Sequence, residues 1–171
     1  GAVSLDSTKR AMLMRHLRRV DPNLSGNRLR RAAQAAYDSY ARYWLESFKL
    51  PHLSARAVDR GMRAEGYAHI TDALAAGNGV ILALPHLGGW EWAGRWLIDN
   101  GLRLTVVVER LEPPELFEWF AGLRRALGMN VVGLGPGAGT QVLRALRANH
   151  VVCLLCDRDI ERSGVEVEFF G

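Results

Sequence analysis

The sequence predicts an α/β protein: a mainly parallel sheet flanked by helices, with a helical layer at the amino terminus. Four short apolar runs follow residue 77, and a helix-like stretch separates each run from the next. Strands buried on both faces read as continuous apolar runs, and parallel sheets alternate strands with helices. We therefore divide the 171 residues into a helical, basic segment over 1–76 and an α/β core over 77–171.

Helical periodicity dominates the first segment. Helices are expected from Asp6–Ser7 to Asp21, from Ser25 to about Phe48, after Ser54, and from Glu65 to Gly77. Pro22 and Pro51 stop the first two, because proline lacks the N–H that continues a helix. Ser and Asp residues stand where side chains can cap a helix start.

The second segment alternates strands with helices. Strands are expected over 80–84, 104–108, 130–134, 151–156 and 165–170, and helices over 89–99, 114–127 and 140–148. In an open sheet of this class, ligands bind outside the carboxyl ends of the strands. Residues that follow the strands are therefore the first candidates for a site.

The charge is unevenly distributed. Residues 1–50 hold ten Lys and Arg against four acids, whereas residues 51–171 hold 12 bases and 14 acids. A basic helical layer on a nearly neutral body favours contact with an anionic surface, and a merely solvated helical face is the bland interpretation. Aromatic residues at helical spacing suggest an interfacial belt, and no base-reading motif accompanies them: Tyr37, Tyr40, Tyr43 and Trp44. We expect a membrane surface rather than nucleic acid.

One motif with catalytic chemistry follows the first strand, where the chain reads Pro85-His86-Leu87-Gly88-Gly89-Trp90-Glu91. A histidine can take a proton from a hydroxyl near neutral pH, and a nearby carboxylate can hold its tautomer. The glycines allow close approach of a ligand, and N–H groups at a helix start can hold an oxyanion or phosphate. The alternative interpretation is a histidine that only caps the helix.

The stretch Leu-Pro-His-Leu-Gly-Gly-Trp-Glu resembles the His-x4-Asp/Glu signature of glycerolipid and lipid A acyltransferases. The lauroyl/myristoyl branch of the lipid A enzymes is the most similar. Further landmarks follow in order: Arg124-x3-Gly128, Asp157-Arg158-Asp159 and residues 164–171. The resemblance covers most of the chain. Family members extend further at both ends, so we expect this chain to be the core of a longer protein.

The resemblance implies an acyl-CoA-dependent O-acyltransferase with His86 as general base. It would move a fatty acyl group, palmitoyl in the member of that branch that the chain resembles most, from acyl-CoA to a mannose hydroxyl of a phosphatidylinositol mannoside. Acyl-CoA would be a co-substrate, and no cofactor or metal is implied. The expected partners are an anionic glycolipid acceptor and the inner leaflet, with the enzyme peripheral on the cytoplasmic face of the plasma membrane and no nucleic acid bound.

The resemblance also assigns carboxylates. Glu91 would orient His86 or its neighbours, and an acid of the loop after the fourth core strand would complete a dyad. We favour Glu161 for that place, although spacing does not choose between it and Asp157 or Asp159. A structural Asp157, tied to Arg124 or Arg125, is the other interpretation.

The remaining assignments concern substrate binding. Arg124 would steady a phosphate or the charge developing on the thioester oxygen. Gly88, Gly89 and Trp90 would contact substrate. Side chains that could line an acyl slot, though core packing is the commoner fate, are Trp90, Trp92, Trp96, Trp119 and Phe120.

A rival pattern lies in the third strand–helix unit. Gly133-x-Gly135-x-x-Ala138, with Asp157 19 residues further on, is similar to a dinucleotide fingerprint and suggests an NAD(P)-dependent oxidoreductase. That fingerprint normally stands in the first unit, Pro136 stiffens the loop, and His86 would have no role. Cys153 and Cys156 have zinc-like spacing but lie within one strand without a second pair, so we expect no metal.

Overall fold

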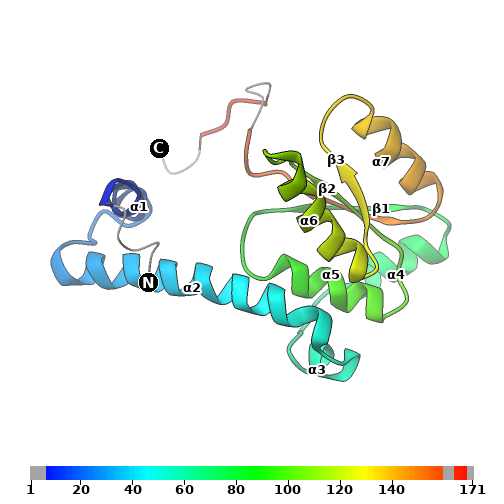
Figure 1. The fold of residues 1–171 in the computed structure, drawn as a ribbon, viewed down its shortest axis with the longest axis horizontal. Helices are drawn as coiled ribbons and strands as arrows, with labels where there is room; N and C mark the ends of the chain where they lie inside the picture. Colours follow the sequence, from blue (N-terminus) through cyan, green and yellow to red (C-terminus); the bar gives the residue numbers. More distant parts are fainter. Residues whose placement is uncertain (1–6, 160–163, 169–171) are drawn as a thin grey trace. The chain divides into compact units, whose positions relative to one another are not determined.

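The computed structural model describes residues 7–159 and 164–168. The described residues fall into two compact units. One unit begins at Glu46 and carries the whole sheet; the other holds residues up to Leu45 together with 164–168. The α/β class predicted from the sequence is confirmed (Figure 1).

The amino-terminal unit consists of two basic helices. α1 spans Ser7–Val20, and α2 spans Gly26–Lys49, so that its last residues belong to the second unit. The turn between them is closed by Asp21, whose Oδ1 accepts the backbone N–H of Asn23 at 2.9 Å. Trp44 packs edge-on against Tyr40 and Tyr43, with ring centroids 6.0 and 5.2 Å away. None of the helices in the described residues is long and apolar enough to cross a bilayer.

The second unit contains a four-stranded parallel sheet in the order β1-β4-β2-β3. Its elements agree with the predicted positions to within a few residues. They are the 3-10 turn Leu50–His52, α3 (Ala55–Arg60), α4 (Tyr67–Ala75), β1 (Val80–Leu84), α5 (Trp90–Asp99), β2 (Leu104–Val108), α6 (Pro114–Ala126), β3 (Asn130–Gly133), α7 (Ala138–Arg147) and β4 (Val151–Leu155).

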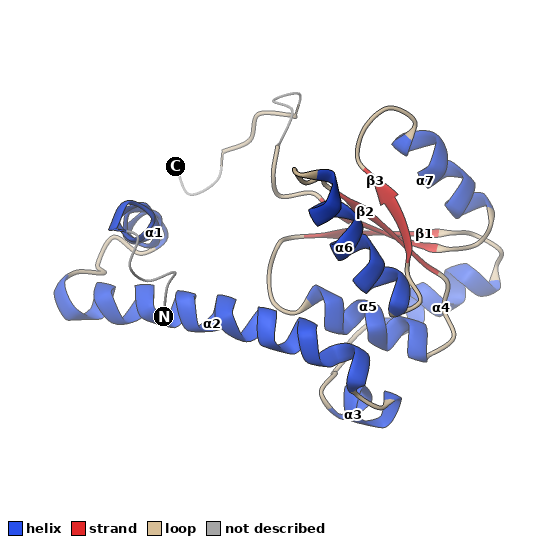
Figure 2. Ribbon diagram, in the orientation of Figure 1, coloured by secondary structure: helices blue, strands red, loops and turns tan. Residues whose placement is uncertain are grey.

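Helices cover both faces of the sheet. The chain moves in one direction along the sheet through α5 and α6, then reverses through α7 to place β4 between β1 and β2. Because such crossovers are right-handed, α5 and α6 lie on one face and α7 on the other (Figure 2). α5 also contacts α3, so the α5 face carries a second helical layer.

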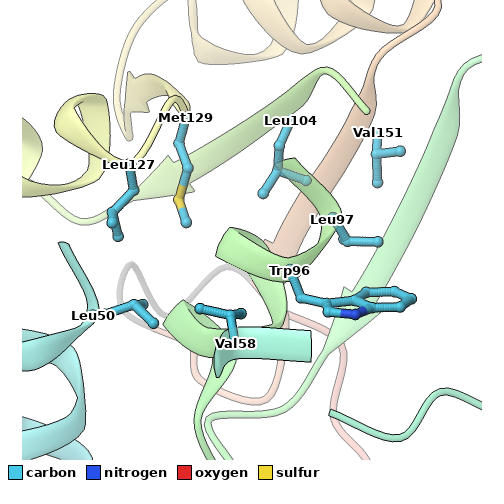
Figure 3. Packing of buried hydrophobic residues seen from close by; sticks show 8 residues of the cluster. All are labelled: Leu50, Val58, Trp96, Leu97, Leu104, Leu127, Met129 and Val151. Carbon is cyan, nitrogen blue, oxygen red and sulfur yellow. The ribbon is translucent and has the colours of Figure 1, made fainter. Parts of the chain in front are cut away.

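The main hydrophobic core lies on the α5 face (Figure 3). Its buried side chains come from the 3-10 turn, α3, α5, the loop before β3 and two strands: Leu50, Val58, Trp96, Leu97, Leu104, Leu127, Met129 and Val151. Gly94 of α5 is required for this packing, because a Cβ there would lie 2.6 Å from Met129 Cε. Trp92 and Trp96, four residues apart on α5, donate their Nε1–H groups to Val58 O and Asp59 Oδ1, both at 2.9 Å.

The strand predicted over 165–170 is wrong in its described part. Residues 165–168 have irregular backbone, and Val165 and Val167 are 89% and 79% exposed. A strand is stable only when a neighbouring strand pairs with it, and the described sheet ends at β1 and β3. Residues 169 and 170 lie outside the described part of the chain.

A buried polar cluster joins the amino ends of the strands. Thr105 of β2 is fully buried, and its hydroxyl accepts from Asn130 Nδ2 at 3.2 Å. The same hydroxyl lies within hydrogen-bond distance of His150 Nδ1, at 2.9 Å. Burial, reinforced by the charge of Arg103, lowers the pKa of His150 below its ordinary value.

This cluster predicts that acid destabilises the fold. Below the ordinary histidine pKa the unfolded chain takes up a proton at His150 that the folded chain does not, so stability is lost as the pH falls through that range. Urea unfolding at pH 7.5 and 5.5 measures the difference. His150→Gln removes the titration and should reduce the pH dependence; an unchanged pH dependence would show that His150 is not its source.

Candidate active site

The parallel pairing of β1 and β4 brings two distant segments together at the carboxyl edge of the sheet. Leu84 pairs with Leu155, and the N–H of Cys156 donates to Leu84 O at 2.9 Å. Continuing the register by two residues places His86 beside Asp157. A sequence-predicted base and a sequence-predicted acid thus become neighbours across 71 residues of chain.

Asp157 holds His86 at two points. Its Oδ1 lies 2.6 Å from His86 Nδ1, and its Oδ2 accepts the backbone N–H of His86 at 2.9 Å. An ionised carboxylate can only accept, so Nδ1 of a neutral His86 carries the proton and Nε2 keeps a lone pair. The His86 side chain is 29% exposed. Its Nε2 is therefore a base in a half-buried setting, with its tautomer and orientation held by Asp157.

The carboxylate is stabilised in its ionised form. Partial desolvation by itself raises the pKa of Asp157. Hydrogen bonds from the His86 side chain, from the His86 backbone and from its own backbone, together with the charge of His86, lower it, and the net pKa is below the ordinary value. Asp157 thus stays charged where a histidine base works, and it can stabilise the imidazolium that forms after proton uptake.

In the loop after His86, the two glycines of the motif have structural roles and the tryptophan contacts the histidine ring. Gly88 has a φ of +68°, a backbone conformation that residues with a Cβ rarely adopt. Gly89 is the N-cap residue of α5. The Trp90 ring lies edge-on to the imidazole, with centroids 5.5 Å apart and an interplanar angle of 83°. Leu87, at the tip of the loop, is 78% exposed.

Glu91 forms an ion pair with Arg124. Its Oε1 accepts from Arg124 Nη2 at 2.6 Å, and the two side chains are only 6% and 17% exposed. This buried ion pair ties α5 to α6, and the predicted roles of Glu91 in orienting His86 or its neighbours and of Arg124 in binding substrate stay predictions. The alternative tie of Asp157 to Arg124 or Arg125 is also not formed, because Arg125 pairs with Glu118.

The other two acids considered as partners of His86 are Glu161 and Asp159. Glu161, favoured as the dyad partner, lies outside the residues that the structure describes. Asp159 is exposed. Sequence reasoning also missed Glu46 of α2, whose Oε2 lies 3.8 Å from the position of a Cβ on Gly89. No local signal marks Glu46, because only the folding of the second unit, to which Glu46 belongs, brings it near Gly89.

The aromatic residues proposed for an acyl slot divide into two groups. Trp92 and Trp96 pack in or against the hydrophobic core and hydrogen-bond to α3, which is the core-packing interpretation. Trp119 of α6 is 54% exposed and packs against Phe48 and Phe120, with centroids 6.0 and 4.8 Å away. An aromatic surface patch, Phe48, Trp119 and Phe120, therefore remains available to an apolar ligand.

The dinucleotide interpretation is not supported. The loop 133–138 follows β3, an edge strand, whereas Asp157 follows β4, and β2 lies between the two. Asp157 is also engaged by His86. Burial raises the pKa of the Cys153 thiol to about 12, so this residue of the C-x2-C pair is not a ready thiolate ligand. In the described part of the chain, no three His, Cys, Asp or Glu residues gather as a metal site.

These features define a histidine–aspartate pair at the carboxyl edge of a parallel sheet, and the chain belongs to the bacterial lipid A biosynthesis acyltransferase family, whose model matches residues 2–171. The resemblance inferred from the motifs is thereby confirmed. The chain is 46% identical over 144 residues to the phosphatidylinositol mannoside acyltransferase of two Mycobacterium tuberculosis strains, covering 80% of this chain and 45% of the relative. It is 42% identical over 141 residues to the Mycolicibacterium smegmatis protein of that name, covering 81% of this chain and 46% of the relative. The chain thus spans somewhat less than half the length of these curated relatives.

Proposed function

We propose that the protein transfers a fatty acyl group from acyl-CoA to a mannose hydroxyl of a phosphatidylinositol mannoside. Palmitoyl is the acyl group that we propose. The observation that carries the proposal is the His86–Asp157 pair, set at the ligand-binding edge of the sheet. Membership of an acyltransferase family supports the reaction class, and the names of the mycobacterial relatives support the acceptor.

In the proposed mechanism, His86 Nε2 takes the proton of the sugar hydroxyl while the oxygen attacks the thioester carbonyl. Asp157 stabilises the resulting imidazolium. When the tetrahedral intermediate collapses, the carbon–sulfur bond breaks and His86 returns the proton to the departing CoA thiolate. A positioned base of this kind contributes a factor of about 10²–10⁴ in rate.

The loop supplies the remaining groups of the proposal. The first backbone N–H groups of a helix have no carbonyl to bind within it, and the oxyanion would be held by such groups in the turn that starts α5 at Gly89. Gly88 keeps the loop clear of a side chain. The aromatic patch of Phe48, Trp119 and Phe120 would contact the acyl chain, because exposed apolar area is stabilised by burial against a hydrocarbon.

The basic helices α1 and α2 would bind the anionic inner leaflet, leaving the enzyme peripheral on the cytoplasmic face of the plasma membrane. Each surface Lys or Arg contributes about 1 kcal/mol of attraction to such a leaflet. Arg15, Arg18 and Arg19 are exposed on α1. They are the residues through which we test this part of the proposal.

Replacing Arg15, Arg18 and Arg19 with glutamate is expected to weaken binding to vesicles containing phosphatidylinositol, most strongly at low salt, because the attraction is screened by ions. Vesicle co-sedimentation measures the effect. The matched control reverses three exposed arginines elsewhere, Arg60, Arg144 and Arg147. Equal binding by the two triple variants would contradict a specific role for α1.

Transfer of labelled palmitate from palmitoyl-CoA tests the proposed reaction. Phosphatidylinositol mannoside should be acylated, and phosphatidylinositol without mannose should not. Titration with CoA and with NAD distinguishes the rival enzyme class. Tight NAD binding without CoA binding, together with no acyl transfer, would overturn the proposal.

A further inference from the structure

The glycine-rich loop that follows β3 has a partner within the protein. A Cβ on Gly133 would lie 3.2 Å from Arg110 Nε and 3.2 Å from Phe117 Cζ, and a Cβ on Gly135 would lie 3.7 Å from the same Nε. Arg110 therefore lies against bare backbone. The glycines that resemble a dinucleotide fingerprint allow an arginine side chain to approach the loop closely.

Arg110 is held from two sides. Its Nε donates to Leu134 O at 3.1 Å, and its Cζ lies 5.9 Å from the centre of the Phe117 ring. These contacts fix the plane of the guanidinium without using its two terminal nitrogens. An arginine oriented in this way loses little further freedom when its terminal N–H groups bind two oxygens of one phosphate.

The charge of Arg110 is not neutralised by the described residues. Glu109, its neighbour, pairs with Arg158 at 3.9 Å, and no described carboxylate forms an ion pair with Arg110. Asp157 is engaged by His86. Arg110 is also exposed. It is therefore an oriented, accessible cation, and its neighbour Glu109 is already paired with Arg158.

Its position suits a ligand that reaches His86. Arg110 follows β2 and leans on the loop after β3, at the same edge of the sheet as the loop after β1. In the order β1-β4-β2-β3, β2 is the second and β3 the third strand from β1. With neighbouring strands about 4.8 Å apart, β2 lies about 10 Å and β3 about 14 Å from β1. An acyl-CoA carries its phosphates at the far end of a long pantetheine arm, so a thioester at His86 can place phosphates in this region.

We infer that Arg110, seated on Gly133 and Gly135, binds a phosphate of the nucleotide end of the acyl-CoA donor. The inference rests on the proposed function, since it names where the donor of that reaction is held. Pantetheine carries no phosphate, so its binding should not depend on Arg110. This difference separates a phosphate contact from a general effect on the site.

Calorimetric titration of the protein with CoA and with pantetheine tests the inference without requiring acyl transfer. Arg110→Gln should weaken CoA binding by about 10- to 100-fold, as expected for loss of charge-assisted hydrogen bonds, and leave pantetheine binding unchanged. Arg110→Lys should recover only part of the affinity, because an ammonium cannot form the planar fork. Arg147→Gln, the same charge change at an exposed residue at the end of α7, is the matched control and should bind CoA normally.

A second variant tests the contact of Arg110 with Gly133. Gly133→Ala places a methyl group against Arg110 and Phe117 while keeping the arginine, so CoA binding should weaken in the same direction but by less. Thermal unfolding establishes that each variant is folded. CoA binding by Arg110→Gln equal to that of the unsubstituted protein overturns the inference and leaves the proposed function standing. No CoA binding by the unsubstituted protein overturns both.

Discussion

Replacing His86 with alanine should abolish acyl transfer to phosphatidylinositol mannoside while leaving the fold intact. The variant removes the Nε2 lone pair and, with it, the factor of about 10²–10⁴ that a positioned base contributes. His86 is 29% exposed and lies in a loop, so its removal does not disturb the core. Initial rates with palmitoyl-CoA measure the loss.

The matched control for this variant is His69→Ala. His69 is an exposed histidine of α4, and its removal should leave the rate unchanged. Circular dichroism establishes that both variants are folded. Transfer by His86→Ala within a few-fold of the unsubstituted rate would rule out His86 as the base.

The second large effect concerns stability. Removing the Arg124 side chain leaves Glu91 buried without its partner, so Arg124→Ala should lower the free energy of unfolding by about 3–5 kcal/mol. Replacing both residues with apolar side chains, Arg124→Met with Glu91→Leu, should recover much of that loss, because no unpaired charge is then buried. Urea unfolding measures both effects.

The neighbouring Arg125–Glu118 pair is the control. Its side chains are 51% and 62% exposed, so Arg125→Ala should cost no more than about 1 kcal/mol. Equal losses from Arg124→Ala and Arg125→Ala would contradict the view that the Glu91–Arg124 pair ties α5 to α6.

Much of the fold is predictable from local sequence pattern. The four apolar runs mark the strands, and proline and glycine mark the helix ends. The edge strand β1 is not buried on both faces as its apolar run predicts, since Ile81 is 51% exposed. His86 is likewise predictable as a site residue, because it directly follows a strand. Residues 165–168 show the limit of such patterns. Their alternating apolar and polar residues predict a strand, but a strand forms only where a neighbouring strand pairs with it.

The partner of His86 could not be chosen from the sequence. β4 comes last along the chain, yet it lies between β1 and β2, and no local pattern specifies that insertion. Only the pairing of Leu84 with Leu155 brings Asp157 to His86. Trp92 and Trp96 were within reach of prediction, because residues four apart on a helix share a face and a buried face belongs to the core.

In the proposed mechanism Asp157 holds His86 as the base of an acyl transfer. Parallel measurement of kcat for Asp157→Asn, Asp159→Asn and Glu161→Gln tests this role, because each variant removes one negative charge between residues 157 and 161. Asp157→Asn should lower kcat by about 10²–10⁴, since the histidine loses its tautomer and the stabilisation of its charged form. The other two variants should remain near the unsubstituted rate. A normal kcat for Asp157→Asn, with the loss found instead in Glu161→Gln, would show that Asp157 is not the catalytic partner of His86.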